Sequence, residues 1–237
     1  MKNIGVKMNP EKIKYTCPAC KKEVEVEAFS NINVTLNPEL KEKLFSGELF
    51  VHECPYCQAK SQVMYSFIYH DMVNKILISF GDEAEHVEEL IQNLQSELSE
   101  EDFDLKQFMQ EYRVRSVKNI NDLFEKIYLF EAELDDRVIE LCKLLILDNA
   151  KEEDLLKDEK ILDIRYLPKE IMQSKGNITD DIIGMNIYCE GDKAFIRTIE
   201  IPFYDQTKNQ IIDLVREKNL MDDLVIDQSW VEKTLLK

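Results

Sequence analysis

Four cysteines form two copies of one short word, Cys-Pro-x-Cys, and their types and spacing could support metal chemistry. Cys17 and Cys20 belong to the first word, and Cys54 and Cys57 belong to the second, after an interval of 33 residues. Each Cys-x-x-Cys turn presents two sulfurs toward one point, and a tetrahedral zinc ion takes four thiolates. The spacing therefore predicts a single Zn²⁺ site with Cys17, Cys20, Cys54 and Cys57 as its ligands.

A redox-active thiol pair and a disulfide are the alternatives for these words. A redox thiol lies at the N-terminus of a helix, where the helix dipole lowers its pKa. Both words here are followed by apolar residues with a period of two, which is typical of strands: Val24, Val26 and Ala28, then Val63, Tyr65, Phe67 and Tyr69. The pattern favours a metal site. Iron also accepts four thiolates, and we prefer zinc because nothing in the sequence indicates electron transfer.

Four cysteine ligands would fill the coordination shell of the metal and leave no position for water. The metal is therefore expected to be structural rather than hydrolytic. Binding at such a site contributes about 10 to 16 kcal/mol, which is comparable to the ~5 to 15 kcal/mol net stability of a whole domain. Loss of the metal should unfold the N-terminal sheet. Lys21 and Gln58 occupy positions where many such turns have glycine, which predicts strain or a different turn shape.

The elements that must position the cysteines indicate a zinc-ribbon-like sheet with one inserted helix. Strands are expected over 23–35, 48–53, 61–70 and 75–80, in one small antiparallel sheet. Residues 37–47 read as a capped helix, with Asn37 as N-cap, Pro38 in the first turn and Gly47 as the stop. This helix accounts for the long interval between the two words.

The rest of the chain predicts a helical segment and then a mixed unit. Helices are expected from Gly81-Asp82 to residue 98, over 99–112, and along an apolar stripe over 120–145 that breaks near Glu133. Strands at 161–167, 183–191 and 193–201 then precede a helix at 203–218 and a last helix containing Trp230. The fold class is α+β, with an N-terminal domain at 1–152 (zinc-ribbon-like sheet 1–82, helical segment 83–152) and a C-terminal α+β domain at 153–237.

The charge distribution bears on which partners the protein can bind. The 237 residues carry a net charge of −17, although residues 1–82 are neutral and residues 83–152 hold 8 basic against 19 acidic side chains. Because nucleic-acid binding depends on Lys and Arg neutralising phosphates, this balance disfavours it, and lysines of residues 1–82 are its only candidates. With no apolar run of ~18 residues and no leader-like N-terminus, we expect a cytoplasmic protein outside the membrane.

Several other residues could take part in chemistry, but each has a simpler explanation. His52 is expected on a strand surface, His70-Asp71 at a turn, and His86 in solvent. Asp135, Asp136 and Arg137 are expected to form a polar helix face or an ion pair, and Cys142 and Cys189 to be buried core thiols. Common catalytic motifs do not occur.

From about Thr16 to about Leu147 the sequence resembles the CpXC domain proteins of bacteria and archaea. The likeness rests on TCPAC, NPELKEKLFSGELFVHECPYC, MYSFIYHD and LDDRVIELCK. The resemblance implies metal binding by Cys17, Cys20, Cys54 and Cys57 and no established biochemical activity.

These observations predict a zinc-binding protein with a structural four-cysteine site. It would serve as a protein-binding or scaffolding module, with another protein or a second copy of itself as partner. The alternative is a hydrolase-like enzyme with a pocket between ribbon and helical segment, using His70 and the acids near residue 135.

Overall fold

The computed structural model describes residues 10–81, 105–152, 156–174, 176, 181–218, 220–221 and 223–235. The chain divides into two compact units, Met1–Phe124 and Glu125–Lys237. The boundary between them in the sequence falls within helix α4 (Ile120–Glu131). The α+β class predicted from the sequence is confirmed. The domain boundary predicted after residue 152 rests on a change of sequence pattern, and it does not coincide with the division between the compact units. The domain boundary stays a prediction.

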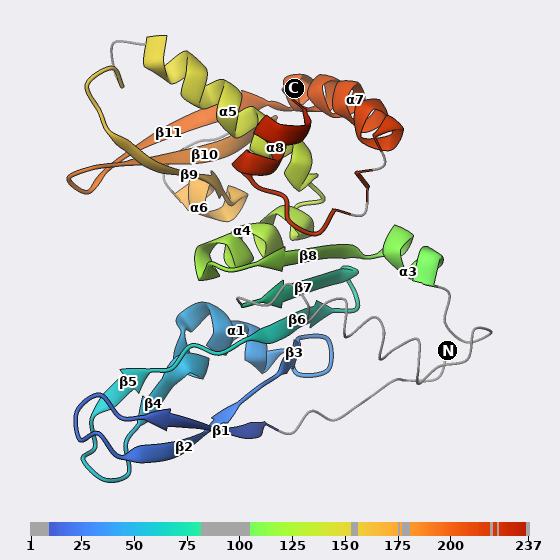
Figure 1. Ribbon diagram of the computed structural model, residues 1–237. Coiled ribbons are helices and arrows are strands. Elements are labelled where there is room, and N and C mark those ends of the chain that lie inside the picture. The colour runs from blue at the N-terminus through green and yellow to red at the C-terminus, as the bar shows by residue number, and fades with distance from the viewer. Residues whose placement is uncertain are drawn as a thin grey trace. The chain divides into compact units, whose positions relative to one another are not determined.

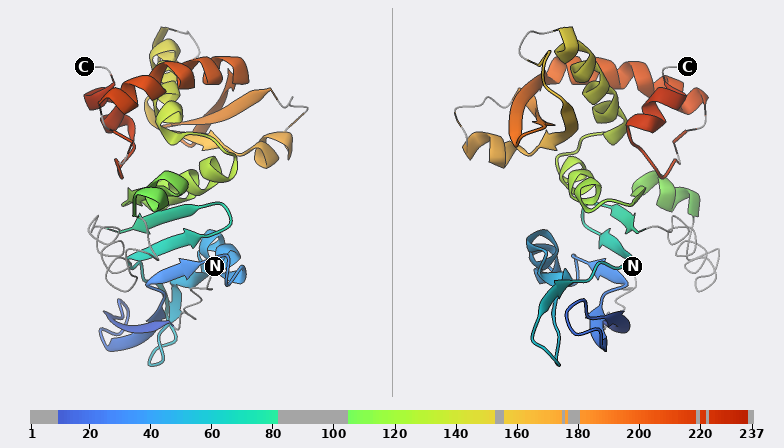
Figure 2. Two further views of the ribbon diagram at one scale, coloured as in Figure 1. Left: turned by 90° about the vertical axis from the view of Figure 1, so that its right-hand side faces the viewer. Right: turned by 60° about the vertical axis from the view of Figure 1, so that its left-hand side comes forward.

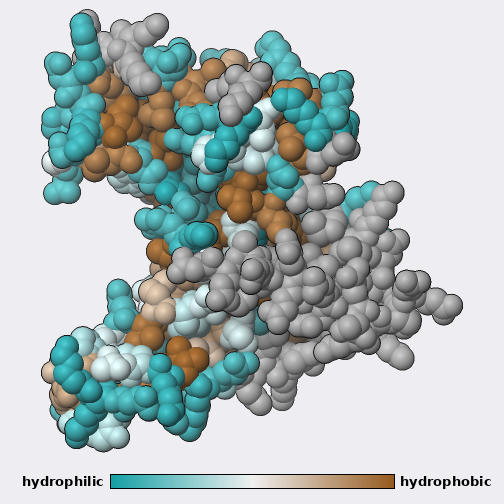
Figure 3. Space-filling view, in the orientation of Figure 1, coloured by the Kyte–Doolittle hydropathy of each residue, from teal (hydrophilic) through white to brown (hydrophobic). Residues whose placement is uncertain are grey.

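Two antiparallel hairpins in the first unit each enclose one Cys-Pro-x-Cys word (Figure 1). The first pairs β1 (Glu11–Thr16) with β2 (Glu23–Ala28), and the second pairs β4 (Val51–Glu53) with β5 (Lys60–Gln62). In β2 the apolar residues alternate with exposed glutamates and lie on the buried face. The hairpin end of the unit is accordingly mostly hydrophilic on the face shown in Figure 3.

The remaining strands of this unit form a separate four-stranded sheet, which Figure 2 shows from two sides. Its order is β3 (Asn31–Asn33), β6 (Phe67–Asp71), β7 (Ile76–Phe80) and β8 (Arg113–Val117). Only β6 and β7 are antiparallel, whereas β3–β6 and β7–β8 are parallel. The single antiparallel sheet expected from the sequence is therefore two hairpins and a mixed sheet, and the strand expected at 61–70 is divided into β5 and β6.

The inserted helix predicted between the words is present as α1 (Glu39–Ser46), with Leu40 and Leu44 buried. It starts one residue later than expected, because Pro38 rather than Asn37 stands at the N-cap. Gly47 ends it with a φ of 75°, a conformation that suits glycine. The short helix η1 (Glu48–Phe50) then leads into β4.

The helical segment expected after the sheet is described only in part. The helix predicted up to residue 98 and residues 99–104 lie outside the described residues. The next helix is α3 (Leu105–Glu111), which ends one residue before the expected end at 112. The apolar stripe forms α4 and α5 (Asp136–Glu152), and the predicted break near Glu133 is confirmed, since Glu133 has a φ of 59°.

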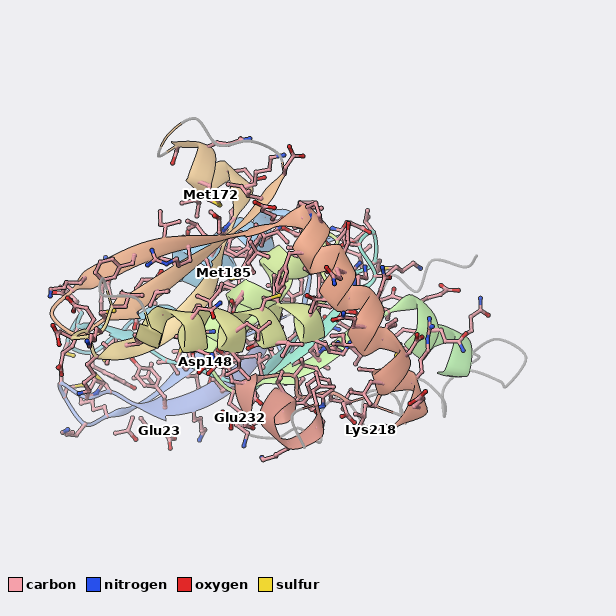
Figure 4. The ribbon with its side chains drawn as sticks, turned by 90° about the horizontal axis from the view of Figure 1, so that it is seen from above. Glu23, Asp148, Met172, Met185, Lys218 and Glu232 are labelled. Atoms are coloured by element: carbon pink, nitrogen blue, oxygen red, sulfur yellow. The ribbon has the colours of Figure 1, made fainter. Side chains whose placement is uncertain are left out.

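The second unit contains a three-stranded antiparallel sheet in the order β11 (Lys193–Glu200), β10 (Ile182–Cys189), β9 (Ile161–Leu167). Helices α7 (Ile201–Glu217) and α8 (Gln228–Thr234) follow. The last one contains Trp230 as predicted, and its side chain is buried. The short helix α6 (Lys169–Ser174) was not predicted. Met172 on α6 packs so closely against Gly184 on β10 that a Cβ atom at this glycine would collide with the methionine sulfur. Figure 4 labels Met172.

Within the described part of the chain, no helix has the length and apolar character needed to cross a membrane.

Candidate metal centre

Both Cys-Pro-x-Cys words fold into the same backbone turn. In the first, the amide of Lys21 donates to the Cys17 carbonyl at 2.9 Å, and the Cys17 amide donates to the Lys22 carbonyl at 2.9 Å. In the second, the Gln58 amide donates to the Cys54 carbonyl at 2.8 Å, and the Cys54 amide donates to the Ala59 carbonyl at 2.9 Å. The first cysteine of each word is thus fixed by two backbone hydrogen bonds.

Lys21 and Gln58, the residues after each word, both have a φ of 61°. This is the left-handed region, where a non-glycine residue costs roughly 1 to 2 kcal/mol. The departure from glycine noted in the sequence therefore brings strain and not a different turn. The two turns thus share the same positive φ and the same pattern of backbone hydrogen bonds.

The four sulfurs converge on a single point. All four Sγ atoms of Cys17, Cys20, Cys54 and Cys57 lie within 4.8 Å of one another. Across the two words, Cys17 Sγ lies 3.7 Å from Cys57 Sγ, and Cys20 Sγ lies 3.7 Å from Cys54 Sγ. A tetrahedron with metal–sulfur bonds of ~2.3 Å has edges of ~3.8 Å. The spacing fits a tetrahedral cation, and it is far longer than the ~2.05 Å of a disulfide bond.

The quartet lies in a very small core. Its buried members are Cys17, Val24, Val26 and Cys54, with Ile13, Tyr15, Cys20 and Val63 packed around them. Cys17 and Cys54 are fully buried, Cys20 is partly buried, and Cys57 is exposed. Two of the four central residues are therefore possible metal ligands, so the hairpins have little apolar area of their own.

The sulfurs influence one another's ionisation. The backbone amide of Cys20 donates to Cys17 and lowers the pKa of that thiol to about 6, against the opposing effect of burial. The Ala59 amide also lowers the pKa of Cys57, but burial and the neighbouring sulfurs outweigh it and raise that pKa to about 12. Four thiolates cannot share this space without a cation, because their charges repel.

Two side-chain contacts join the hairpins and their turns. The Lys22 ammonium lies 4.3 Å from the ring centroid of Tyr56, which joins one word to the other. The hydroxyl groups of Tyr15 and Ser61 lie 3.2 Å apart and join the two hairpins. The two contacts therefore join the hairpins through side chains other than the cysteines.

His52, two residues before Cys54, is not a member of the sulfur cluster. Its side chain is partly buried, and burial lowers its pKa. Among the described residues its Nε2 atom has no hydrogen-bond partner. It is therefore less exposed than the strand-surface position predicted from the sequence.

His70 and Asp71 end strand β6 and take structural roles, in keeping with the predicted turn. Asp71 accepts hydrogen bonds from the amides of Val73 and Asn74 at 3.0 Å each. The Asn33 side-chain nitrogen lies 3.4 Å from His70 Nδ1, and the Tyr112 hydroxyl lies 3.3 Å from Nε2.

The protonation of His70 follows from its neighbours. The Asn33 oxygen accepts the amides of Thr35 and Leu36, so its nitrogen must face His70 and donate to Nδ1. His70 is then neutral with its proton on Nε2, directed toward Tyr112. Burial is the main cause that lowers the pKa of His70 to about 4.

The acids near residue 135 form ion pairs, as one of the two predictions for them stated. Asp135 and Arg137 form a bidentate pair at 2.8 and 2.9 Å, and Asp136 pairs with Lys126 at 2.8 Å. His70 belongs to the first compact unit and these acids to the second, so the predicted pocket that would join them stays a prediction. Cys142 and Cys189 are buried as expected, and His86 lies outside the described residues.

A buried ionic network in the second unit was missed from the sequence. Lys143 donates to Glu125 at 2.8 Å and to Glu140 at 2.9 Å, and the side chains of all three are at most 6% exposed. Burial raises the pKa of Glu140, whereas at Glu125 burial is outweighed by Lys143 and other donors, which lower the pKa of that carboxyl. The only signal in the sequence is a lysine inside an apolar helical run.

Arg165 on β9 extends this network to the sheet. Its guanidinium donates to Glu125 at 3.0 Å, and the Tyr166 amide donates to the same carboxylate at 2.6 Å. Lys126 donates to the Ile226 carbonyl at 2.7 Å and so fixes the segment before α8. The network therefore connects α4, α5, β9 and the C-terminal segment.

Comparisons with curated proteins and with solved structures found no match. The profile of the family described as CpXC protein matches residues 15–143, which is more than half of the chain and includes all four clustered cysteines. The chain therefore belongs to the CpXC protein family.

Proposed function

We propose that Cys17, Cys20, Cys54 and Cys57 bind one Zn²⁺ ion as a structural centre that joins the two hairpins. The single observation that carries this proposal is the meeting of four free sulfurs within 4.8 Å of one another. Four thiolates complete a tetrahedral shell, so the metal would hold the fold and would not activate water.

The small size of the core supports a structural role. Burying apolar surface contributes roughly 25 cal/mol per Å², and the core of these hairpins has only four fully enclosed members, two of which are cysteines. A four-thiolate metal site contributes about 10 to 16 kcal/mol. The metal would thus be the largest single contribution to the stability of the hairpins.

We infer that the metal-bound hairpins serve as a protein-binding or scaffolding module in a reducing compartment such as the cytoplasm. Three large apolar side chains on the second hairpin, in its turn and just after it support a docking role: Val51 in β4 is 44% exposed, Tyr56 in the turn 59%, and Met64, two residues after β5, 48%. The partner would be a second copy of this chain or another protein with a matching apolar surface.

Elemental analysis of the purified chain tests the metal part of the proposal. We expect about one zinc per chain and loss of the near-UV signal of the tyrosines in the hairpins after a strong chelator removes it. Protein that folds and holds no stoichiometric metal would reject the proposal.

Sedimentation velocity over a range of concentrations tests the docking part. The zinc-loaded chain should associate if a second copy is the partner, and a V51S/M64S variant should weaken that association. Val73, which is 75% exposed and lies outside the hairpins, provides the matched control V73S. A chain that stays monomeric requires a different protein as partner, and equal weakening by V73S would reject this surface.

A further inference from the structure

The four cysteines differ sharply in their access to solvent. Cys17 and Cys54 are fully buried, and Cys57 is exposed, although its sulfur lies in the same cluster. A thiol that coordinates a metal is deprotonated outright, so the raised pKa of Cys57 without a metal would not keep it protonated in the zinc-loaded chain. The oxidation of such thiolates then follows their exposure. A reagent in solution therefore meets one sulfur of the quartet before the others.

A second sulfur is placed to react with the first once that one is oxidised. Cys17 Sγ lies 3.7 Å from Cys57 Sγ, and the two belong to different words and different hairpins. Cys20 and Cys54 form the other cross-hairpin pair at the same distance. A buried thiolate beside an exposed one is the arrangement of a resolving cysteine next to a redox-sensitive cysteine.

We propose that Cys57 is the site where peroxides oxidise this protein, and that Cys17 resolves the product to a Cys17–Cys57 disulfide with release of the metal. This inference rests on the proposed zinc site. Peroxides are the class of oxidant, and hydrogen peroxide is the simplest member.

The two steps balance. The Cys57 thiolate attacks one oxygen of hydrogen peroxide, so that an S–O bond forms, the O–O bond breaks, and hydroxide leaves with the electron pair. Cys57 is now a sulfenic acid. The Cys17 thiolate then attacks the Cys57 sulfur, the S–S bond forms, the S–O bond breaks, and a second hydroxide leaves. Two thiolates have lost two electrons, and the peroxide has gained them.

The consequence of this particular pairing is that the hairpins stay joined. A disulfide within one word would leave β1–β2 and β4–β5 without a covalent link, whereas a Cys17–Cys57 disulfide connects the first word to the second. Oxidation would thus remove two of four ligands and release the metal, but it would keep a covalent link where the metal had been. A dithiol reverses the reaction and restores the ligands.

Peptide mapping of the full, zinc-loaded chain tests the pairing. Trypsin cleaves after Lys14, Lys21, Lys43 and Lys60, so one peptide carries the first word and another carries the second. After treatment with one equivalent of hydrogen peroxide, we expect the two peptides joined through Cys17 and Cys57, with zinc appearing in parallel on a chromogenic chelator. Disulfides confined within the words would overturn the proposal.

Limited alkylation with N-ethylmaleimide tests the order of access. Cys57 should be modified first, followed by Cys20, with Cys17 and Cys54 last, while buried Cys142 and Cys189 serve as internal controls outside the cluster. First modification of Cys17 or Cys54 would overturn the proposal.

Two variants make the test independent of folding defects. Histidine also ligates zinc, so Cys57→His should keep the metal and slow peroxide-driven release by about ten-fold, because the exposed thiolate is gone. Cys20→His keeps Cys57 and should release zinc at close to the wild-type rate. Equal rates for the two variants would contradict the proposal. Zinc stoichiometry is measured before peroxide is added, so failure of the metal site is distinguished from failure of the oxidation step.

Discussion

The metal-centre hairpins and the second compact unit solve the same stability problem in different ways. The hairpins have a core of four enclosed residues and gather four sulfurs inside it. The second unit has a three-stranded sheet with helices and encloses a network of lysines and carboxylates that are at most 6% exposed. Under the proposed function the small hairpin pair depends on a metal, whereas the larger unit can tolerate the cost of buried charge when every charge has a partner.

The largest expected effect is the loss of one metal ligand. Cys54→Ser should remove the metal and unfold the hairpins, since a site of this kind contributes on the order of 10 kcal/mol. Residues 125–237 should keep their amide dispersion in an NMR spectrum while residues 11–28 and 51–62 lose theirs. Cys142→Ala, a buried cysteine of the second unit, is the control and should retain the metal. Collapse of both units together would contradict the comparison.

The second largest effect is expected from a substitution that breaks the ionic network of the second unit. Lys143→Met leaves Glu125 and Glu140 buried without their main partner and should lower the free energy of unfolding of the second unit by about 3 to 5 kcal/mol. The exposed pair Lys160–Glu190, at 68% and 65% exposure, gives the control Lys160→Met, with an expected change of at most ~1 kcal/mol. Urea unfolding measures both, and zinc content should not change in either variant.

A smaller effect concerns pH and the first unit. The pKa of His70 falls from its usual 6.5 to about 4 in the folded chain. The unfolded chain then binds a proton at His70 below pH 6.5 while the folded chain does not, so stability is full above 6.5 and declines as the pH falls toward 4. Between pH 7 and 5 we expect a loss of up to ~2 kcal/mol.

The variant His70→Gln should remove most of this pH dependence in urea unfolding curves. An NMR titration of the wild-type chain should also show the His70 ring still neutral at pH 5, with its proton on Nε2. A midpoint near 6.5 would show that the contacts with Asn33 and Tyr112 do not hold the ring as described.

The smallest expected effect compares residues that have the same positive φ in the hairpins and in the second unit. Lys21→Gly and Gln58→Gly should each stabilise the metal-bound hairpins by about 0.5 to 1 kcal/mol, because glycine removes the strain of a positive φ. Glu133 has a φ of 59°, so Glu133→Gly is the matched change in the second unit. Each variant should raise the unfolding midpoint of its own unit only. A lower midpoint for the two hairpin variants would mean that the side chains of Lys21 and Gln58 contribute more than the strain costs.

The cluster of sulfurs could be predicted because its determinants are local. Each word carries its own turn, so the residues at Cys17–Cys20 and Cys54–Cys57 identify the site without any knowledge of the rest of the fold. The inserted helix and the strands of the second unit also follow from local periodicity and from turn residues such as Gly47 and Gly191.

Features that depend on distant partners could not be predicted in the same way. Strand β8 is a five-residue segment, RVRSV, whose only strand partner in the described sheet is the parallel strand β7. Lys126 and Lys143 are both buried, because Lys126 donates to the Ile226 carbonyl and Lys143 donates to Glu125 on α4. Such contacts arise between segments that are far apart in the sequence, where periodicity carries no information.

X-ray absorption at the zinc edge on the purified chain tests the central claim most directly. The account predicts one zinc per chain with four sulfur neighbours at ~2.3 Å and no nitrogen or oxygen ligand. A metal bound by nitrogen or oxygen, or a folded chain whose four sulfurs hold no metal, would contradict it.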